Sequence, residues 1–249
     1  MNFSDKLIKA AENTIETFES GKKAQNAEWW DGFIKGRTNN NRLVASYMFQ
    51  NFDPDNFYPT KDLYPYTITN MFTRFGYYQK KTVDLKKRLE DCGVKLDFSV
   101  RHSGVTSYAF SSTWITTLPE ISFTSTSSST KLNYTFDGSS YLETIEKLVV
   151  KPNTTSSYAF RGCTSLTHII LEVIDDGKIK GTWDFSYSPL DIESMKSIIA
   201  VLYDYSGTDE NLTYSILFTD DCWANLEADS TSPTGTTWKK YVEDLGWLS

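Results

Sequence analysis

The segment SYAFRGCTSLTHIIL, residues 157–171, decides how this chain is expected to fold. Three other segments are similar to it: SYAFSSTWITTLPEI (107–121), NYTFDGSSYLETIEKL (133–148) and TWDFSYSPLDIESM (182–195). Their phenylalanines, at intervals of 26, 24 and 25 residues, are Phe110, Phe136, Phe160 and Phe185. A regular period of this length is typical of proteins built from stacked, similar units.

Further apolar residues follow each phenylalanine at similar distances. They are Ile115, Leu142 and Leu166, then Leu118, Ile145 and Ile169, and in the last segment Leu190. Because so short a unit cannot bury its own apolar face, neighbouring units have to stack. The sequence therefore predicts ladders of Phe, Leu and Ile along one core, with a strand from each unit paired in parallel.

The residues of the segment 157–171 also resemble a known family. Phe160, Cys163 with the following Thr-Ser-Leu, and Ile169 match the leucine-rich repeat of the BspA-like kind, which is encoded by gut bacteria and their phages. The other segments are degenerate, with Thr113 or Ser139 in place of the cysteine. The resemblance implies an α+β fold: a short leucine-rich-repeat solenoid with parallel strands, an N-terminal helical cap and a C-terminal α/β cap.

Three regions follow from this interpretation. Residues 1–92 are expected to form a long helix and an aromatic, proline-rich capping region, and AEWWDGFIKGRTNNNR within it resembles a leader that precedes such repeats. Residues 93–189 are expected to form the solenoid. Residues 190–249 are expected to form a helix–strand–helix cap that hides the last open sheet edge.

The N-terminal helix is expected over residues 3–35, with Ser4 as its N-cap. Apolar residues recur at three- and four-residue spacing up to Phe18, after which the same positions turn polar. This pattern fits an amphipathic helix lying on the body of the protein. It also fits a short coiled coil, through which the chain would form a homo-oligomer.

An aromatic cluster lies near the end of this helix. Trp29 and Phe33 are four residues apart and are expected to pack inward, leaving Trp30 partly exposed. The alternative is a platform on which sugar rings stack. Residues 82–91 predict a further helix that ends at Gly93, followed by a half-buried strand over 94–100.

The C-terminal region shows three patterns of its own. A helix with Asp191 as N-cap and an apolar face that includes Met195 and Ile198 comes first. A strand over residues 211–219 follows. A second helix over residues 236–249 is expected to stop at Gly246.

Composition limits the class of partner. The net charge is −7 and no basic stripe is present, which argues against nucleic acid. No apolar run approaches the ~20 residues that span a bilayer, so no membrane insertion is expected. Aromatic residues make up 15%, with tyrosine prominent, and tyrosine suits recognition surfaces.

Few residues point to chemistry. The two histidines are His102 and His168, and no nucleophile elbow, P-loop, dinucleotide fingerprint or zinc-protease motif is present. The acid pairs at 175–176 and 220–221 and the DPDN segment at 53–56 are expected to be solvated turns. Three cysteines, Cys92, Cys163 and Cys222, form neither a disulfide pattern nor a zinc pattern. We expect no enzyme, no cofactor and no catalytic or metal-binding residue, and the ligand-binding residues are left open.

The favoured function is a non-enzymatic component of a phage virion, in the tail, baseplate or a fibre, that attaches to a host protein or glycan. No signal peptide is expected from the N-terminal residues, and a virion protein assembled in the bacterial cytoplasm needs none. The alternatives are a bacterial cell-surface adhesin, and a carbohydrate-active enzyme that uses a groove of the solenoid. The Ser/Thr-rich segment 122–130 would be either a solvated turn or a hydroxyl-lined face for glycans.

Overall fold

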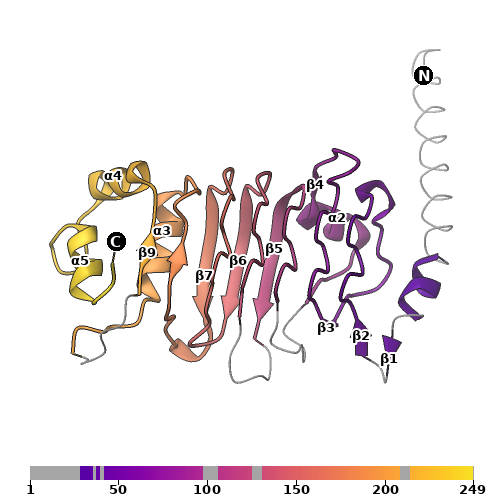
Figure 1. Ribbon diagram of the computed structural model, residues 1–249, viewed down its shortest axis with the longest axis horizontal. Helices are drawn as coiled ribbons and strands as arrows, with labels where there is room; N and C mark the ends of the chain where they lie inside the picture. The colour runs from indigo at the N-terminus through magenta and orange to yellow at the C-terminus, as the bar shows by residue number, and fades with distance from the viewer. Residues whose placement is uncertain are drawn as a thin grey trace, which may run out of the picture.

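The computed structural model describes residues 29–35, 38–39, 42–97, 106–124, 131–207 and 214–248. In these residues the chain is an elongated α+β protein whose strands lie side by side across the middle (Figure 1). Residues 29–35 are helical, whereas residues 3–28 of the expected N-terminal helix lie outside the described residues. The predicted homo-oligomer through that helix therefore stays a prediction.

The central sheet has four parallel strands in the order β4-β5-β6-β7. They are β4 (Val83–Asp84), β5 (Ile115–Phe123), β6 (Thr144–Val150) and β7 (His168–Val173). Leu118 lies opposite Ile145, which lies opposite Ile169, and all three side chains are buried. The predicted parallel pairing is confirmed for the segments that contain Phe110, Phe136 and Phe160, whereas the segment of Phe185 adds no strand to this sheet.

Two smaller sheets flank the central one. One has the order β1-β2-β3, formed by β1 (Thr38–Asn39), β2 (Arg42–Val44) and β3 (Pro65–Thr67). The other pairs β8 (Trp183–Asp184) in parallel with β9 (Ile216–Leu217). Short 3-10 turns, η1 (Pro54–Asn56) and η2 (Ile174–Asp176), join longer elements.

The buried phenylalanines form a continuous column of rings. Phe136 stacks on Phe110 with centroids 5.6 Å apart and on Phe160 at 5.3 Å, and the ring planes differ by 15° and 17°. Phe160 in turn stacks on Phe185 at 4.5 Å. The predicted stacking of these rings is confirmed, and each of the four residues is at most 1% exposed.

The column continues beyond the four segments that the period identified. On the N-terminal side, Phe72 stacks on Phe110 at 5.2 Å and 6°, and Phe49 lies 5.0 Å from Phe72. On the C-terminal side, Phe218 stacks on Phe185 at 5.9 Å. The column thus crosses the expected region boundaries near residues 92 and 189.

The turn around each phenylalanine has one recurring backbone geometry. The residues two before and two after Phe136 are Tyr134 and Gly138, and both have positive φ. Positive φ recurs at the same two places around Phe49, Phe72, Phe110 and Phe160. These residues donate their backbone N–H groups to the next turn along: Tyr134 to Ser157 and Gly138 to Arg161. A left-handed backbone is costly away from glycine, so these stacking hydrogen bonds help to hold it.

A second ladder of polar side chains runs beside the rings. The Ser139 hydroxyl donates to the Phe110 carbonyl at 2.6 Å, and the Cys163 thiol donates to the Phe136 carbonyl at 3.2 Å. Ser188, at the same place after Phe185, donates instead to the Cys163 carbonyl at 3.2 Å. Ser139, Cys163 and Ser188 are all buried, and each supplies a short side-chain donor to a backbone carbonyl of the preceding segment.

Helices cover both edges of the central sheet. α2 (Leu85–Cys92) follows β4, begins at the N-cap Asp84 and ends at Gly93 in the left-handed conformation, so the predicted glycine stop is confirmed. α3 (Ile192–Ala200) lies against β7. The backbone N–H groups of Ile169 and Leu171 donate to the hydroxyls of Ser194 and Ser197. These serines take the place of another strand, which leaves that edge less open to pairing with a second chain.

The C-terminal elements end the ring column. α4 (Asp220–Asp229) places Trp223 edge-on against Phe218, with centroids 5.1 Å apart. α5 (Trp238–Asp244) ends just before Gly246, whose φ is positive, as expected for its stop. One expectation is wrong: Asp220 and Asp221 do not lie in a turn between elements. They form the first turn of α4, where the helix dipole stabilises carboxylates.

The remaining expectations have mixed outcomes. The predicted strand 94–100 is reduced in the described residues to a single bridge between Leu96 and Leu63. Asp53 caps the 3-10 turn η1, and Asp175 and Asp176 lie in η2, so the expected turns at these acids are confirmed. No helix among the described residues is long and apolar enough to cross a bilayer.

Candidate functional site

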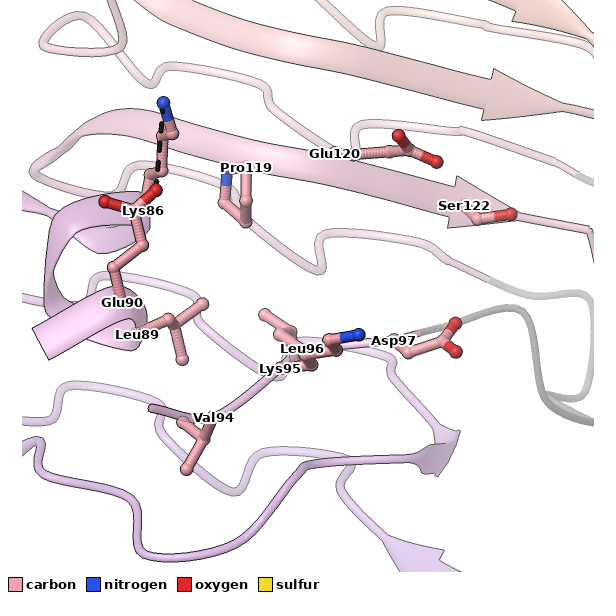
Figure 2. Close-up of a pocket in the computed structure, with 10 residues that line it drawn as sticks. All are labelled: Lys86, Leu89, Glu90, Val94, Lys95, Leu96, Asp97, Pro119, Glu120 and Ser122. Atoms are coloured by element: carbon pink, nitrogen blue, oxygen red, sulfur yellow. Dashed lines mark ion pairs between the residues drawn. The ribbon is translucent and has the colours of Figure 1, made fainter. Parts of the chain in front are cut away.

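A cleft of about 530 Å³ opens between α2, the segment 94–97 and β5. Figure 2 shows Leu89, Leu96 and Pro119 toward its interior, and charged side chains at its rim. The volume lies in the range of small-molecule sites, roughly 300–1,000 Å³. β4 pairs only with the start of β5, and the chain then continues as α2. The rest of β5 therefore has no β4 neighbour on this side, and the cleft lies there. Pro119 removes one backbone donor from β5 at this place.

Asp62 anchors the wall of the cleft that contains Lys95. The backbone N–H of Lys95 donates to the Asp62 carboxylate at 2.8 Å, and the Tyr64 hydroxyl donates to it at 3.0 Å. Both hydrogen bonds lower the pKa of Asp62 below its usual value, and the bond from Lys95 has the larger effect. Leu63 and Leu96 form a backbone bridge beside this contact, so the wall is held by the neighbouring segment.

Three charged side chains that line the cleft, Lys86, Glu90 and Glu120, take part in ion pairs. Lys86 lies 3.2 Å from Glu146 and 3.8 Å from Glu90. Glu120 belongs to a row on the sheet surface in which Lys147 lies 3.6 Å from Glu120. The Glu90 and Glu120 side chains are 64% and 59% exposed.

His168 is half-buried at the start of β7. Its Nδ1 atom lies 2.7 Å from the carboxylate of Asp191, the N-cap of α3. Asp191 also accepts a hydrogen bond from the backbone N–H of Ser194. Burial acts to raise the pKa of Asp191, but the hydrogen bonds from Ser194 and His168 outweigh it, so that the pKa is lowered. His102 lies outside the described residues.

The lowered pKa of Asp191 gives a pH-dependent prediction. A carboxyl group whose folded-state pKa is depressed stabilises the protein above its unfolded pKa of about 3.9, and this contribution is lost as the pH falls through the folded value. We expect Asp191→Asn, which keeps a capping oxygen, to be less stable than the natural protein at pH 6 and to approach it below pH ~4. Asp191→Ala loses the cap as well and should cost about 0.5–2 kcal/mol. Urea unfolding at several pH values measures both, and a pH-independent difference for Asp191→Asn would contradict the assignment.

A column of tyrosines forms an outer ridge of the molecule. Tyr134 stacks on Tyr108 with centroids 4.9 Å apart at 6°, and on Tyr158 at 5.2 Å and 19°. Arg161 lies over the rings of Tyr134 and Tyr158 and forms a bidentate ion pair with Asp137. Because the rings cover one another's faces, the ridge presents ring edges and hydroxyl groups. The period of the sequence indicated this row, since Tyr108, Tyr134 and Tyr158 each precede a core phenylalanine by two residues.

In the aromatic cluster near residue 30, the buried and the exposed tryptophan are exchanged relative to the expectation. Trp30 is buried, 1% exposed, and packs against Phe49 and Phe57, whereas Trp29 is 47% exposed and stacks on Phe33 at 4.8 Å. The prediction that Trp29 packs inward is therefore wrong. Helical spacing shows which residues share a face, but the position of Phe49 decides which face meets the body.

The cysteines differ in their environment. Burial raises the pKa of the Cys163 thiol to about 12, and Cys222 is buried between the carbonyls of Ser188 and Leu190. Cys92, at the end of α2, is partly exposed. The three cysteines form no disulfide with one another, and in the described part of the chain no group of three or more metal-binding side chains is found.

These environments predict selective labelling. Since the thiolate is the reactive form, a disulfide reagent such as DTNB at pH 8 should modify only Cys92 in the folded protein. All three thiols should react after unfolding in guanidinium. Cys92→Ser should abolish the labelling of the folded protein and leave the labelling of Cys163 and Cys222 after unfolding unchanged. Fast labelling of Cys163 in that variant would contradict its burial.

Comparisons of the chain with models of protein families, with curated proteins and with solved structures find no match.

Proposed function

We propose that this chain is a BspA-like leucine-rich-repeat protein, with a short solenoid of parallel strands between a helical N-terminal cap and a C-terminal α/β cap. The ring column of Phe110, Phe136 and Phe160 supports this proposal, because residues at one period occupy equivalent places. The recurring left-handed turns support it too, since they place the same hydrogen bonds between successive turns.

The same features extend the proposed array toward the N-terminus. Phe49 and Phe72 belong to the ring column, and the residues two before and two after each of them have positive φ. Asn51 donates its backbone N–H to Thr73, as Gly138 does to Arg161. We therefore place two further turns of the solenoid within the region expected to be a separate cap, and assign the capping role to Trp30 and the helix that carries it.

The proposed role is attachment: a non-enzymatic virion protein of a phage, in its tail, baseplate or a fibre, that binds a host surface protein or glycan. One observation carries it. Among the described residues, eight of the ten exposed large hydrophobic side chains are tyrosines. A rigid, column-packed body that exposes tyrosine suits recognition, because tyrosine supplies contact area and a hydroxyl at small entropic cost. The virion would assemble in the bacterial cytoplasm beside its other proteins.

The test uses the full chain, fluorescently labelled, on an array of bacterial surface glycans and on intact gut bacteria. Saturable binding to at least one glycan or strain is expected, and an unrelated protein of similar size and net charge serves as control. Absence of binding to every target would refute attachment and leave an architectural role. Release of reducing sugar from a bound glycan would instead favour an enzyme that uses the cleft beside β5.

A second measurement separates the virion from the adhesin. Mass spectrometry of purified phage particles and of bacterial envelopes, both from cultures that express the native gene, should find the chain in the particles. Its presence in the envelope of cells without phage would favour the cell-surface alternative.

A further inference from the structure

Four aromatic side chains meet at the edge of the molecule where the strands of the central sheet begin. Tyr77 and Tyr78 precede β4, Trp114 immediately precedes β5, and Tyr141 precedes β6. We call this group, Tyr77, Tyr78, Trp114 and Tyr141, the aromatic shelf. The ring centroids of Tyr77 and Tyr78 are 5.3 Å apart, those of Tyr77 and Trp114 are 6.5 Å apart, and those of Trp114 and Tyr141 are 4.3 Å apart.

The geometry of the aromatic shelf differs from that of the tyrosine column. Tyr77 meets Tyr78 at 85° and Trp114 at 82°, so these pairs are edge-to-face. In such a pair, one ring keeps both faces clear of its partner, whereas the tyrosine column covers ring faces by stacking. The third pair, Trp114 and Tyr141, is tilted at 35°, and Trp114 is half-buried. Tyr77, Tyr78 and Tyr141 are 46%, 60% and 40% exposed. Open aromatic faces carry partial negative charge and attract the polarised C–H groups on one side of a pyranose ring.

The backbone holds the aromatic shelf in place. The N–H of Trp114 donates to the Phe75 carbonyl at 2.9 Å, and the Trp114 carbonyl accepts from Val83 at 3.0 Å. Gly76 lets the chain pass close to the base of the Trp114 side chain, because a Cβ atom at position 76 would lie 3.1 Å from the Trp114 Cβ atom. A surface fixed in this way loses little conformational entropy when a ligand binds.

Two cations lie in the turn that presents Tyr77 and Tyr78. The backbone N–H of Tyr77 donates to the Arg74 carbonyl, and that of Lys80 donates to the Tyr77 carbonyl. The Arg74 guanidinium lies 3.4 Å from the Tyr78 hydroxyl. Within the described part of the chain, Arg74 and Lys80 have no carboxylate at ion-pair distance, whereas the neighbouring Lys81 is paired with Asp55.

The Arg74 and Lys80 side chains are both exposed, in a chain whose net charge is −7. A cation without a carboxylate partner attracts an anionic group on a ligand. We propose that the aromatic shelf binds an acidic saccharide, whose sugar rings lie on Trp114 and the tyrosines and whose anionic group meets Arg74 and Lys80. This inference rests on the proposed attachment function and names its site and ligand class.

Affinity electrophoresis tests the site. The protein runs in native gels that contain polygalacturonate, an acidic polysaccharide, or dextran, a neutral one, and a glycan array with acidic and neutral members runs in parallel. The protein should be retained by polygalacturonate in the gel or bind an acidic glycan on the array, and dextran should not retain it. This binding should weaken as the salt concentration rises, because salt screens the ionic contact.

Variants then locate the binding. Tyr78→Ala and Arg74→Gln change exposed side chains and should each reduce binding about tenfold, the equivalent of ~1.4 kcal/mol. Trp114→Ala should reduce it further, and its circular dichroism spectrum checks that it folds. Tyr187→Ala, which removes an exposed tyrosine outside the aromatic shelf, should bind as the natural protein does.

The outcomes separate this site from the general role. Undiminished binding by Tyr78→Ala and Arg74→Gln would overturn the aromatic shelf and leave attachment through another surface. Preference for neutral glycans would overturn the acidic ligand. Failure of the natural protein to bind any glycan or cell would overturn the proposed function together with this inference.

Discussion

Replacing Phe136 by alanine is expected to lower the free energy of unfolding by about 3–5 kcal/mol. The ring is fully buried and stacks on both Phe110 and Phe160, so its removal leaves a cavity in the middle of the column. The backbone on either side is tied to the neighbouring turns and cannot collapse into the space. Urea unfolding followed by circular dichroism measures the loss, which would be a large part of the stability of an ordinary domain.

Tyr158→Ala is the matched control for this experiment. Tyr158 also belongs to a stacked aromatic column, but that column lies on the surface and the side chain is 52% exposed. Its truncation should cost less than about 1 kcal/mol. If Phe136→Ala and Tyr158→Ala cost the same, the buried ring column would not be the main support of the fold.

The second large effect is expected for Gly76→Ala. Gly76 has φ of +75°, and a Cβ atom there would lie 2.3 Å from the Lys81 carbonyl oxygen and 3.1 Å from Pro54 and Trp114. The backbone strain and the overlap with backbone act together, so the expected loss is on the order of 3 kcal/mol. Thermal and urea unfolding measure it. Because Gly76 packs on Trp114, glycan binding by this variant should fall as well.

Two other glycines divide this effect into its parts. Gly93 has φ of +67° but no atom within 4 Å of its would-be Cβ, so Gly93→Ala should show the backbone strain alone, about 1 kcal/mol. Gly207 has neither a positive φ nor a close neighbour. Gly207→Ala should be neutral or slightly stabilising, because it restricts the unfolded chain. A loss for Gly76→Ala no greater than that for Gly93→Ala would contradict the close approach to Lys81.

The period of the phenylalanines was sufficient to predict the ring column between Phe110 and Phe185, but not its ends. Phe49, Phe72 and Phe218 were not predicted, because the intervals that join them to the array are irregular. Phe49 and Phe72 themselves are 23 residues apart, but 38 residues separate Phe72 from Phe110, and 33 separate Phe185 from Phe218. In both places a helix, α2 or α3, follows the turn in place of a long strand. The helix changes the spacing while the turn around the phenylalanine keeps its geometry.

The aromatic shelf was less accessible from the sequence than the tyrosine column. The column repeats one position of the period, two residues before Phe110, Phe136 and Phe160. The shelf draws on different positions, since Trp114 follows its phenylalanine by four residues and Tyr141 follows by five, and Tyr78 has no counterpart at the same spacing. Its cations come from a turn that the sequence pattern presented only as irregular.

The sequence by itself determined the stacked phenylalanines, the parallel strands and the helix caps Asp191, Gly93 and Gly246, because each depends on local spacing or on the conformational preference of one residue. The tertiary structure decided which face of the helix at Trp30 is buried, how α2 and α3 cover the sheet edges, and which aromatic side chains gather at one end of the strands. These features depend on contacts between residues far apart in the chain, whose energies exceed local preferences and leave no periodic trace.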